Sequence, residues 1–324
     1  MTPQTSKPEG KVAVKISVVI RTYTQDETEV GCLLTTLAEQ SVPPWEFVVI
    51  DSGSALPVQD QLRHCQRSGI ETSADRSIPL RLLEIPNQAY QSARALNWAI
   101  EAAQGELIAI ISQDALPADA YYLERLAAAF DDALVAGAYG RQMIPVTGYP
   151  LWEKDLAKTY PPHSRLQRQP DCWFVNACSM IRRDLWQQHA FDEQAMISED
   201  HEWAKWFQGQ GYVIQYEAAA IVYHYHDEQL GDIWRRFFVE GQGLAYIHRR
   251  RMSLWQTCFR GMREMASDGL WLMRRGMVWY WPIALVRRAV KYAGLYWGHR
   301  AGDTRRPRGR MQQRESSLER SSQA

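Results

Sequence analysis

Cysteine is scarce in this chain of 324 residues, and its five cysteines are so dispersed that no C-x-x-C pair occurs. An odd number of separated cysteines argues against a disulfide scaffold and a tetrahedral zinc knuckle, and it fits a reducing compartment. We expect no secretory signal, because the polar segment 1–11 contains no apolar core. The remaining composition, 46% hydrophobic and 23% charged, is that of a globular protein.

Long apolar runs are missing as well. The best candidate for a transmembrane helix is 276–286, a run of 11 residues that lies between two arginines and contains Pro282. At about 1.5 Å per residue such a helix covers roughly 16 Å, whereas the hydrocarbon core of a bilayer is about 30 Å thick. We therefore expect no helix that crosses a membrane.

Three motifs of common enzyme classes are also absent. The chain has no G-x-x-x-x-G-K-[ST], no G-x-G-x-x-G after an apolar run, and no G-x-S-x-G. Their absence excludes a P-loop nucleotide site, leaves a Rossmann dinucleotide site unsupported, and argues against an α/β-hydrolase.

The charge is balanced overall, with 37 Lys+Arg and 37 Asp+Glu, but it is unevenly distributed. Residues 249–324 hold 17 basic and 5 acidic side chains, whereas residues 1–248 hold 20 and 32. A basic end suggests contact with an anionic surface, either membrane or nucleic acid. Aromatic side chains among these basic residues favour a helix lying in a membrane interface. The alternatives are an amphipathic helix packed on the domain or on a partner subunit, and binding of single-stranded nucleic acid.

Short apolar runs rich in β-branched residues alternate with segments that have the periodicity of a helix. The runs predict buried strands at 16–20, 45–50, 80–85 and 106–111. The periodic segments predict helices at 30–40, 89–103 and 118–130. This alternation predicts an α/β fold with a largely parallel, covered sheet, in which a ligand binds at the carboxyl ends of the strands.

The second half of the chain has a less regular pattern. We expect a loop with short helices over 143–169, and a strand followed by a helix over 173–186. Further along, the pattern predicts a helix at 198–208, short strands at 212–216 and 221–225, helices from 230 onward, and disorder after 302.

Two aspartates follow buried strands directly. Asp51 ends the run 48–50, and Asp114 comes shortly after 106–111. A carboxylate at such a place is unfavourable unless it binds something. Asp114 is suited to a hard cation such as Mg²⁺ or Mn²⁺, and Asp51 to a hydrogen bond with a base or ribose. The alternative is that each caps the turn or helix that follows.

Two further clusters carry titratable side chains. Glu199 and Asp200 are adjacent at the start of a predicted helix, where mutual repulsion can raise one pKa to suit a general base, or where both simply cap the helix. His224 and His226 are two residues apart on a predicted strand, so both can face one metal site. The alternative is a partly exposed edge strand.

The order of these pieces resembles family 2 glycosyltransferases. The nucleotide-binding half of the family is matched at 16–23, 48–54, 95–97 and 103–106. The segments 111–117 and 135–142 resemble the metal-binding and following segments of the bacterial branch that includes rhamnosyltransferases. The pattern is completed at 174–183, 198–203 and 222–226, so the resemblance covers roughly residues 14–245.

The resemblance implies a GT-A fold and an inverting transfer from a nucleotide-activated sugar. It implies that Thr22, Tyr23 and Asp51 bind the base and ribose. Further contacts to the nucleotide sugar are expected from Ser52, Asn97, Gln113 and Arg141. Asp114, in the last position of the DXD motif, and His224 would hold a divalent cation, Mg²⁺ or Mn²⁺. Asp200 would be the catalytic base, with Glu199 beside it.

Two positions depart from the family pattern. The first DXD position is Ser112, which lacks a carboxylate, and the usual acidic pair after the second strand is Asp51-Ser52. The departures loosen the expected metal dependence and leave the identity of the nucleotide open.

We therefore expect four parts: a disordered leader (1–13), a GT-A catalytic domain (14–248), an amphipathic helical region for membrane association (249–300) and a disordered basic tail (301–324). The expected enzyme is cytoplasmic and peripheral on the inner face of the plasma membrane. It would transfer sugar to a glycan or lipid-linked acceptor in bacterial surface polysaccharide synthesis, with an anionic membrane and no nucleic acid as partner. The alternative is a non-catalytic nucleotide-sugar-binding partner of another transferase.

Overall fold

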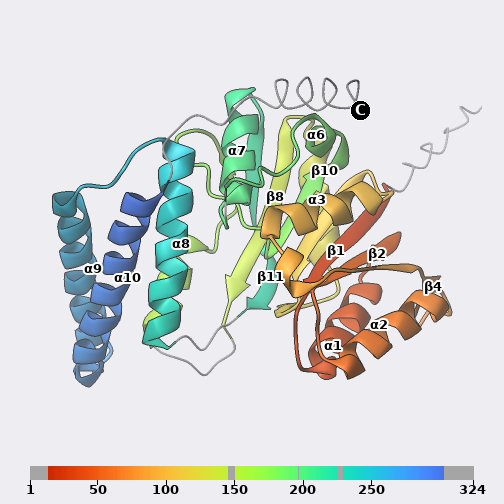
Figure 1. The fold of residues 1–324 in the computed structure, drawn as a ribbon, viewed down its shortest axis with the longest axis horizontal. Coiled ribbons are helices and arrows are strands. Elements are labelled where there is room, and N and C mark those ends of the chain that lie inside the picture. Colours follow the sequence, from red (N-terminus) through yellow and green to blue (C-terminus); the bar gives the residue numbers. More distant parts are fainter. Residues whose placement is uncertain (1–13, 145–149, 196, 225–228, 303–324) are drawn as a thin grey trace, which may run out of the picture.

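A central mixed sheet with helices on both faces, flanked by long C-terminal helices, forms the protein (Figure 1). This computed structural model describes residues 14–144, 150–195, 197–224 and 229–302. The main sheet has nine strands in the order β5-β2-β1-β6-β10-β8-β11-β7, with β9 paired to β11. The α/β fold class expected from the sequence is confirmed.

Four parallel strands form one half of this sheet: β5 (Leu80–Glu84), β2 (Glu46–Asp51), β1 (Ile16–Thr22) and β6 (Leu107–Ser112). Their alternate side chains face opposite sides, as the two-residue period of a strand requires. Val18 and Ile20 pack into one core cluster with Leu33, whereas Val19 packs into a second cluster with Leu96.

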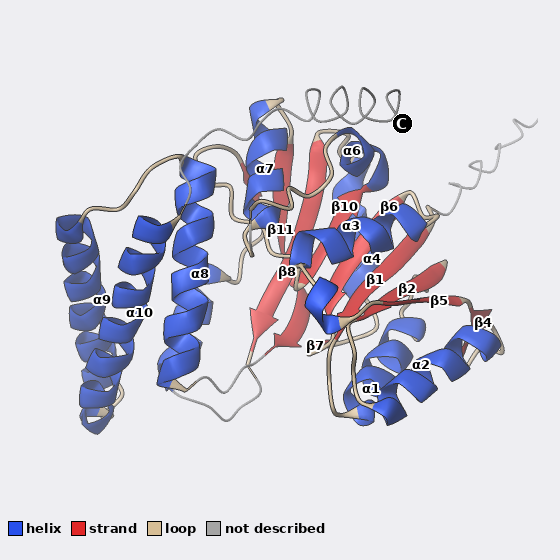
Figure 2. Ribbon diagram, in the orientation of Figure 1, coloured by secondary structure: helices blue, strands red, loops and turns tan. Residues whose placement is uncertain are grey.

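Helices cover both faces of these strands. On one face lie α1 (Glu27–Ala38), whose first turn is capped by the Asp26 side chain, and α2 (Leu56–Ser68). The opposite face is covered by α3 (Ser92–Ala102), as Figure 2 shows. The sequence did not predict α2, because only Val58 and Leu62 of that helix are buried and its apolar stripe is thin.

The other half of the sheet is mixed rather than parallel. The strand β10 (Cys178–Arg182) runs antiparallel to β6 and to β8 (Val135–Met143). The two short strands expected at 212–216 and 221–225 form one strand, β11 (Val213–His224), because an irregularity between Glu217 and Ile221 is absorbed without breaking the pairing to β8. The short strands β7 (Ala115–Pro117) and β9 (Arg165–Gln167) pair antiparallel to β11.

Shorter helices connect these strands and carry site residues. They are α4 (Tyr122–Ala128), α5 (Pro150–Thr159), α6 (Arg183–Gln188) and α7 (Glu199–Gly209), with the 3-10 turns η1 (Asn87–Ala89) and η2 (Ala129–Asp131). A separate two-stranded sheet pairs β3 (Ile70–Glu71) with β4 (Ser77–Ile78).

The C-terminal helices are α8 (Leu230–His248), α9 (Leu254–Arg274) and α10 (Trp281–Ala301), with η3 (Val278–Tyr280) before α10. The backbones of α8 and α10 touch at glycines, since a Cβ on Gly298 would lie 2.0 Å from the Phe238 carbonyl oxygen. The helix α8 thus packs with the segment that follows residue 248. No helix in the described ranges is long and apolar enough to cross a membrane, as the sequence predicted.

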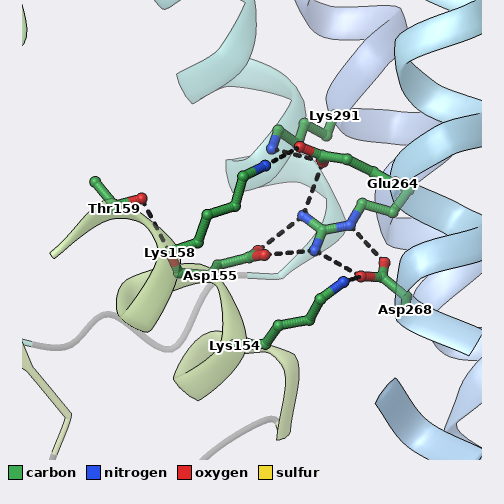
Figure 3. A network of polar contacts seen from close by, with 8 residues as sticks. Lys154, Asp155, Lys158, Thr159, Glu264, Asp268 and Lys291 are labelled. Carbon is green, nitrogen blue, oxygen red and sulfur yellow. Dashed lines mark hydrogen bonds and ion pairs between the residues drawn. The ribbon is translucent and has the colours of Figure 1, made fainter. Parts of the chain in front are cut away.

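A buried charge network joins α9 and α10 to α5 (Figure 3). The Arg288 guanidinium donates hydrogen bonds to Asp155 at 2.6 and 2.8 Å and to Asp268 at 2.7 and 3.2 Å. Lys154 Nζ lies 2.5 Å from Asp268, and Glu264 accepts from Lys291 at 3.1 Å. The acidic side chains of α9 therefore face inward, toward the protein.

Candidate active site

A cavity of about 330 Å³ opens at the carboxyl ends of β1, β2 and β6. Five residues expected to bind the nucleotide sugar or the metal line it: Thr22, Tyr23, Ser52, Gln113 and Asp114. The other lining residues are Arg21, Asn87, Tyr90 and Ser112. The rings of Tyr23 and Tyr90 are 53% and 41% exposed, so both are accessible to a planar ligand.

Asp51 lies at the end of β2 and is buried. Its carboxylate accepts hydrogen bonds from Thr22 Oγ1 at 2.9 Å, from the backbone N–H of Gly53 at 3.1 Å and from Ser54. These contacts fix the turn after β2, which is the capping role that the sequence left open. The same contacts hold Thr22 and Ser52 at the cavity wall.

Gln113 holds the Tyr23 loop in place. Its Oε1 accepts from the Tyr23 backbone N–H at 2.7 Å, and its Nε2 donates to the Tyr23 carbonyl at 3.2 Å and to Glu29 at 3.3 Å. The loop after β1 is thereby fastened to the end of β6, which gives the cavity a defined wall.

Asp114 and His224, the two expected metal ligands, are brought together from β6 and β11. His224 Nε2 lies 3.3 Å from Asp114 Oδ1. On the other side of the ring, His224 Nδ1 lies 3.1 Å from Gln142 Oε1, while Gln142 Nε2 donates to Cys178 Sγ at 3.7 Å. Because the Gln142 amide nitrogen is directed at Cys178 and its oxygen accepts from Nδ1, the ring directs Nε2 at the carboxylate, where a proton or a metal ion can lie between the two atoms.

This donor set fits a divalent cation. Two acceptor atoms that face each other repel unless a proton or a metal ion lies between them, and Gln142 supplies the outer hydrogen bond typical of a metal-bound histidine. The described residues contain no group of three or more His, Cys, Asp and Glu side chains that could hold a metal ion. A bound cation would therefore complete its coordination with substrate oxygens and water, as Mg²⁺ commonly does.

Glu199 and Asp200 begin α7, and the structure gives them different surroundings. Glu199 is buried at 2% exposure, whereas Asp200 is partly exposed. Asp200 accepts hydrogen bonds from the backbone N–H groups of Asn176 at 3.1 Å and His201 at 2.8 Å. Asp200 is therefore the more exposed residue of the pair.

Burial shifts both carboxyl groups toward the protonated form. It raises the pKa of Asp200 to about 6, even though the two backbone N–H groups lower it. Burial, and then the neighbouring charge of Asp200, raise the pKa of Glu199. A carboxylate that titrates near pH 6 has the basicity that general base catalysis at neutral pH requires.

Arg21 connects the cavity with this acidic pair. It lines the cavity, and its Nη1 donates to Ser92 Oγ on α3, which in turn donates to Glu199 Oε1. The Arg21 Nη1 and Glu199 Oε1 atoms are 3.8 Å apart. The donor cavity and the candidate base are thus neighbours in one continuous site.

Asn97 and Arg141 do not line the cavity. Asn97 Oδ1 accepts from the Trp186 indole at 3.1 Å and from the Phe191 N–H at 3.0 Å, and its Nδ2 donates to the Phe191 carbonyl at 2.9 Å. Asn97 thereby fastens α3 to α6 and to the segment before α7, and its expected contact with the nucleotide sugar stays a prediction. Arg141 lies on β8, next to Gln142.

Several residues of the site were not singled out from the sequence. They are Arg21, Asn87, Tyr90, Ser92, Gln142 and Asn176. Arg21, Gln142 and Asn176 stand inside the segments that carry the family resemblance, and this was the available signal. His226 lies outside the described residues.

Comparisons with known proteins agree with this geometry. A family model described as "Glycosyl transferase family 2" matches residues 17–189. The O-antigen chain rhamnosyltransferase RfbN of Salmonella typhimurium is 23% identical over 298 residues, which cover 88% of this chain and 90% of that protein.

Solved structures of glycosyltransferases share the fold. A mannosyltransferase from Pyrobaculum calidifontis, PcManGT in complex with GDP-Man and Mn²⁺, superposes with a TM-score of 0.62 at 17% identity, covering 90% of this chain and 89% of that one. TarS 1–349 of S. aureus superposes with a TM-score of 0.50 at 16% identity, covering 89% and 92%. At these identities the likeness concerns the fold.

Proposed function

The chain belongs to glycosyl transferase family 2 and has the GT-A fold, and on this premise we propose that it is an inverting glycosyltransferase that uses a nucleotide-diphosphate sugar. The observation that carries the proposal is the placement of Asp200. Asp200 is the more exposed residue of the acidic pair, burial raises its pKa to about 6, and its neighbour Glu199 is linked through Ser92 and Arg21 to the cavity that contains Asp114.

In the proposed reaction an acceptor hydroxyl attacks the anomeric carbon of the sugar, and the nucleoside diphosphate leaves. Asp200 takes the hydroxyl proton, and a base in this position accelerates such a step by roughly 10²–10⁴-fold. Asp114 and His224 would hold a divalent cation, which stabilises the negative charge of the leaving diphosphate. Tyr23 and Tyr90 at the cavity mouth are suited to stack on the base.

The proposed donor is a deoxythymidine- or uridine-diphosphate sugar, with rhamnose as the first sugar to test. The relative RfbN, a rhamnosyltransferase of the O-antigen chain, supports this choice. The proposed acceptor is a glycan or a lipid-linked glycan in the synthesis of a bacterial surface polysaccharide. The complex of PcManGT with Mn²⁺ supports the use of a divalent cation.

We also propose a peripheral position on the inner face of the plasma membrane, and the outer face of α9 supports this proposal. The inward stripe of this helix contains Glu264 and Asp268, whereas its outward stripe is apolar. The exposed apolar side chains of α9 are Leu254, Trp255, Phe259, Met262, Leu270 and Met273. The following elements η3 and α10 also carry exposed apolar side chains, among them Trp279 and Ile283. We call this set of eight residues the α9 apolar face.

Basic side chains border the α9 apolar face. Arg260, Arg263 and Arg274 are exposed on the same helix. Residues 249–302 contain eleven Lys and Arg but only two Asp and Glu, and both acids are used in the buried network. Tryptophan and leucine next to arginine suit an anionic bilayer surface, where each basic residue contributes about 1 kcal/mol.

Vesicle flotation tests the membrane proposal. The wild type should float with phosphatidylglycerol-containing vesicles at 150 mM salt and remain behind with neutral phosphatidylcholine. The double variant Trp255→Ser/Trp279→Ser should weaken binding by about tenfold or more, because each indole buries a large apolar area. Trp98→Ser, an exposed tryptophan on α3, is the matched control. Unchanged binding of the double variant would place the contact elsewhere.

A donor screen tests the catalytic proposal. Purified protein is incubated with a panel of nucleotide sugars and a lipid-linked acceptor, with and without Mg²⁺ or Mn²⁺, and release of nucleoside diphosphate is followed. Asp200→Asn should lower turnover by roughly 10²–10⁴-fold while nucleotide affinity changes less than twofold. Glu202→Gln, on the same turn of α7 but bonded to His189, is the control. Donor binding without transfer would favour a non-catalytic partner of another transferase.

A further inference from the structure

The buried carboxylate of Glu199 is a feature that the transfer reaction does not itself require. Glu199 is almost completely buried, so it cannot meet an acceptor. Its Oε1 accepts from Ser92, and its Oε2 is buried without a hydrogen-bond partner in the described part of the chain. A buried carboxylate with one unsatisfied oxygen is unfavourable, so its presence calls for a compensating charge.

Arg21 supplies that charge from a different element. Its side chain is 18% exposed, and its Nη1 lies 3.8 Å from Glu199 Oε1. Arginine is rare in a buried parallel strand, and here its neighbours on β1 are the core residue Ile20 and the cavity residue Thr22. The guanidinium therefore has the donor cavity on one side and the first turn of α7 on the other.

We propose that Arg21, acting through Ser92 and Glu199, is a positioning residue for the base: it fixes the first turn of α7 beside the donor cavity and favours the ionised form of Asp200. The inference rests on the proposed glycosyl transfer. It assigns Glu199 the role of an anchor, while Asp200 alone takes the proton.

The charge environment of Asp200 supports this assignment. Arg21 acts on both carboxylates in the same direction, lowering the pKa of Glu199 and that of Asp200. The negative charges of the two acids oppose each other. The other titratable groups that face Asp200 are Tyr160 after α5, Cys172 before β10 and His201 on α7. Arg21 is the cation among these groups, so its removal should change the pKa of Asp200 in a predictable direction.

Two substitutions separate the effect of Arg21 from that of Glu199. Arg21→Gln removes the positive charge, so the pKa of Asp200 should rise by about one unit. Glu199→Gln keeps the shape of the side chain. Because the charge of Asp200 raises the pKa of Glu199, Asp200 loses its proton first, beside a neutral Glu199, and the pKa of Asp200 should stay in place in this variant. The acid limb of the pH profile of kcat/KM should move by the same amounts. Arg94→Gln, which removes a surface ion pair with Glu193, should leave the limb in place.

The direct measurement is the titration of Asp200 by ¹³C NMR of the carboxyl carbons in aspartate-labelled, full-length protein, with Asp200→Asn used to assign the signal. This readout does not need a donor or acceptor. A merely structural role of Arg21 would lower kcat at every pH but leave the titration of Asp200 unchanged.

The outcomes separate this inference from the proposed function. An unshifted Asp200 signal in Arg21→Gln would overturn the inference, and transfer by the wild type would still stand. A shifted signal in a protein that transfers no sugar would overturn the proposed function alone. If Arg21→Gln does not fold, as shown by circular dichroism, Arg21→Lys decides the question. It keeps the charge but not the planar guanidinium that donates to Ser92, so kcat should fall while the titration of Asp200 stays in place, and an unchanged kcat would overturn the inference.

Discussion

Replacing Arg288 by methionine should destabilise the whole C-terminal helical unit. The guanidinium is nearly buried and donates to the carboxylates of Asp155 and Asp268, the second of which is fully buried. Removing one partner of a buried ion pair typically costs about 3–5 kcal/mol, because a charge is left without compensation. Lys154 still pairs with Asp268 at 2.5 Å, so we expect the lower end of this range, about 3 kcal/mol.

The assay is urea unfolding followed by far-ultraviolet circular dichroism and by tryptophan fluorescence. For a protein of this size, a loss of about 3 kcal/mol corresponds to a fall in Tm of roughly 4–5 °C in thermal unfolding. Arg263→Met is the matched control, since this arginine is exposed on α9 and should change stability by less than about 0.5 kcal/mol. The double variant Arg288→Met/Asp268→Leu should recover part of the loss, because it also removes the buried carboxylate that has lost its arginine, and Lys154, whose side chain is 16% exposed, can then reach solvent.

The reasoning would be refuted by a loss of less than about 1 kcal/mol in Arg288→Met, since a buried ion pair cannot be broken so cheaply. It would also be refuted if the double variant were less stable than Arg288→Met. That result would mean that Asp268 stabilises the helices without its arginine partner.

Three further predictions concern helix packing and pH. Gly298→Ala should destabilise the protein by about 1–3 kcal/mol in thermal unfolding, because the new Cβ would lie 2.0 Å from the Phe238 carbonyl oxygen. Gly231→Ala is the control, and because it has open space around it, this variant should be neutral or stabilising by up to about 1 kcal/mol. The kcat/KM for transfer should fall about tenfold per pH unit below pH 6, because Asp200, with its pKa near 6, must be ionised to accept the proton. A stopped assay from pH 5 to 8 measures this profile, and a flat profile would contradict the assignment of Asp200 as the base. Burial would raise the pKa of Glu264, but the charges of Lys291 and Arg288 lower it to about 2. The stabilising contribution of Glu264 is therefore complete above pH 4.5 and is lost as the pH falls toward 2. In urea unfolding over that pH interval, the wild type should lose about 2–3 kcal/mol more than Glu264→Gln.

The central strands could be predicted from the sequence because local chemistry decides them. The runs 16–20, 45–50 and 106–111 are apolar and β-branched, and β1, β2 and β6 occupy almost the same residues. The direction of β10 and the continuity of β11 depend on pairing with distant strands, and spacing along the chain carries no information about that pairing. The helix α2 escaped prediction because two buried side chains do not make a visible period.

The strand ends predicted from the sequence indicated where the cavity lies, but the side-chain contacts between distant residues could not be deduced. Asp51 and Asp114 were placed correctly at the carboxyl ends of β2 and β6. The contact between Arg21 and Glu199 joins residues far apart in the chain, and only the fold brings them together. The hydrogen bonds that Asn97 accepts from Trp186 and Phe191 also depend on the fold, and no local sequence pattern indicates them.

The contacts between α8 and α10, and the charge network that joins α5 to α9 and α10, define which segments can be exchanged between related transferases. A chimaera that joined residues 1–248 to the terminal helices of a relative would separate Gly241 of α8 from the α10 backbone that lies against it. It would also leave Lys154 and Asp155 facing foreign side chains. An exchanged unit that preserves both sets of contacts must contain α5 together with residues 230–301, although these two segments are separated in the chain. Shuffling experiments should therefore cut the gene in three places: before α5, after α5 and before α8.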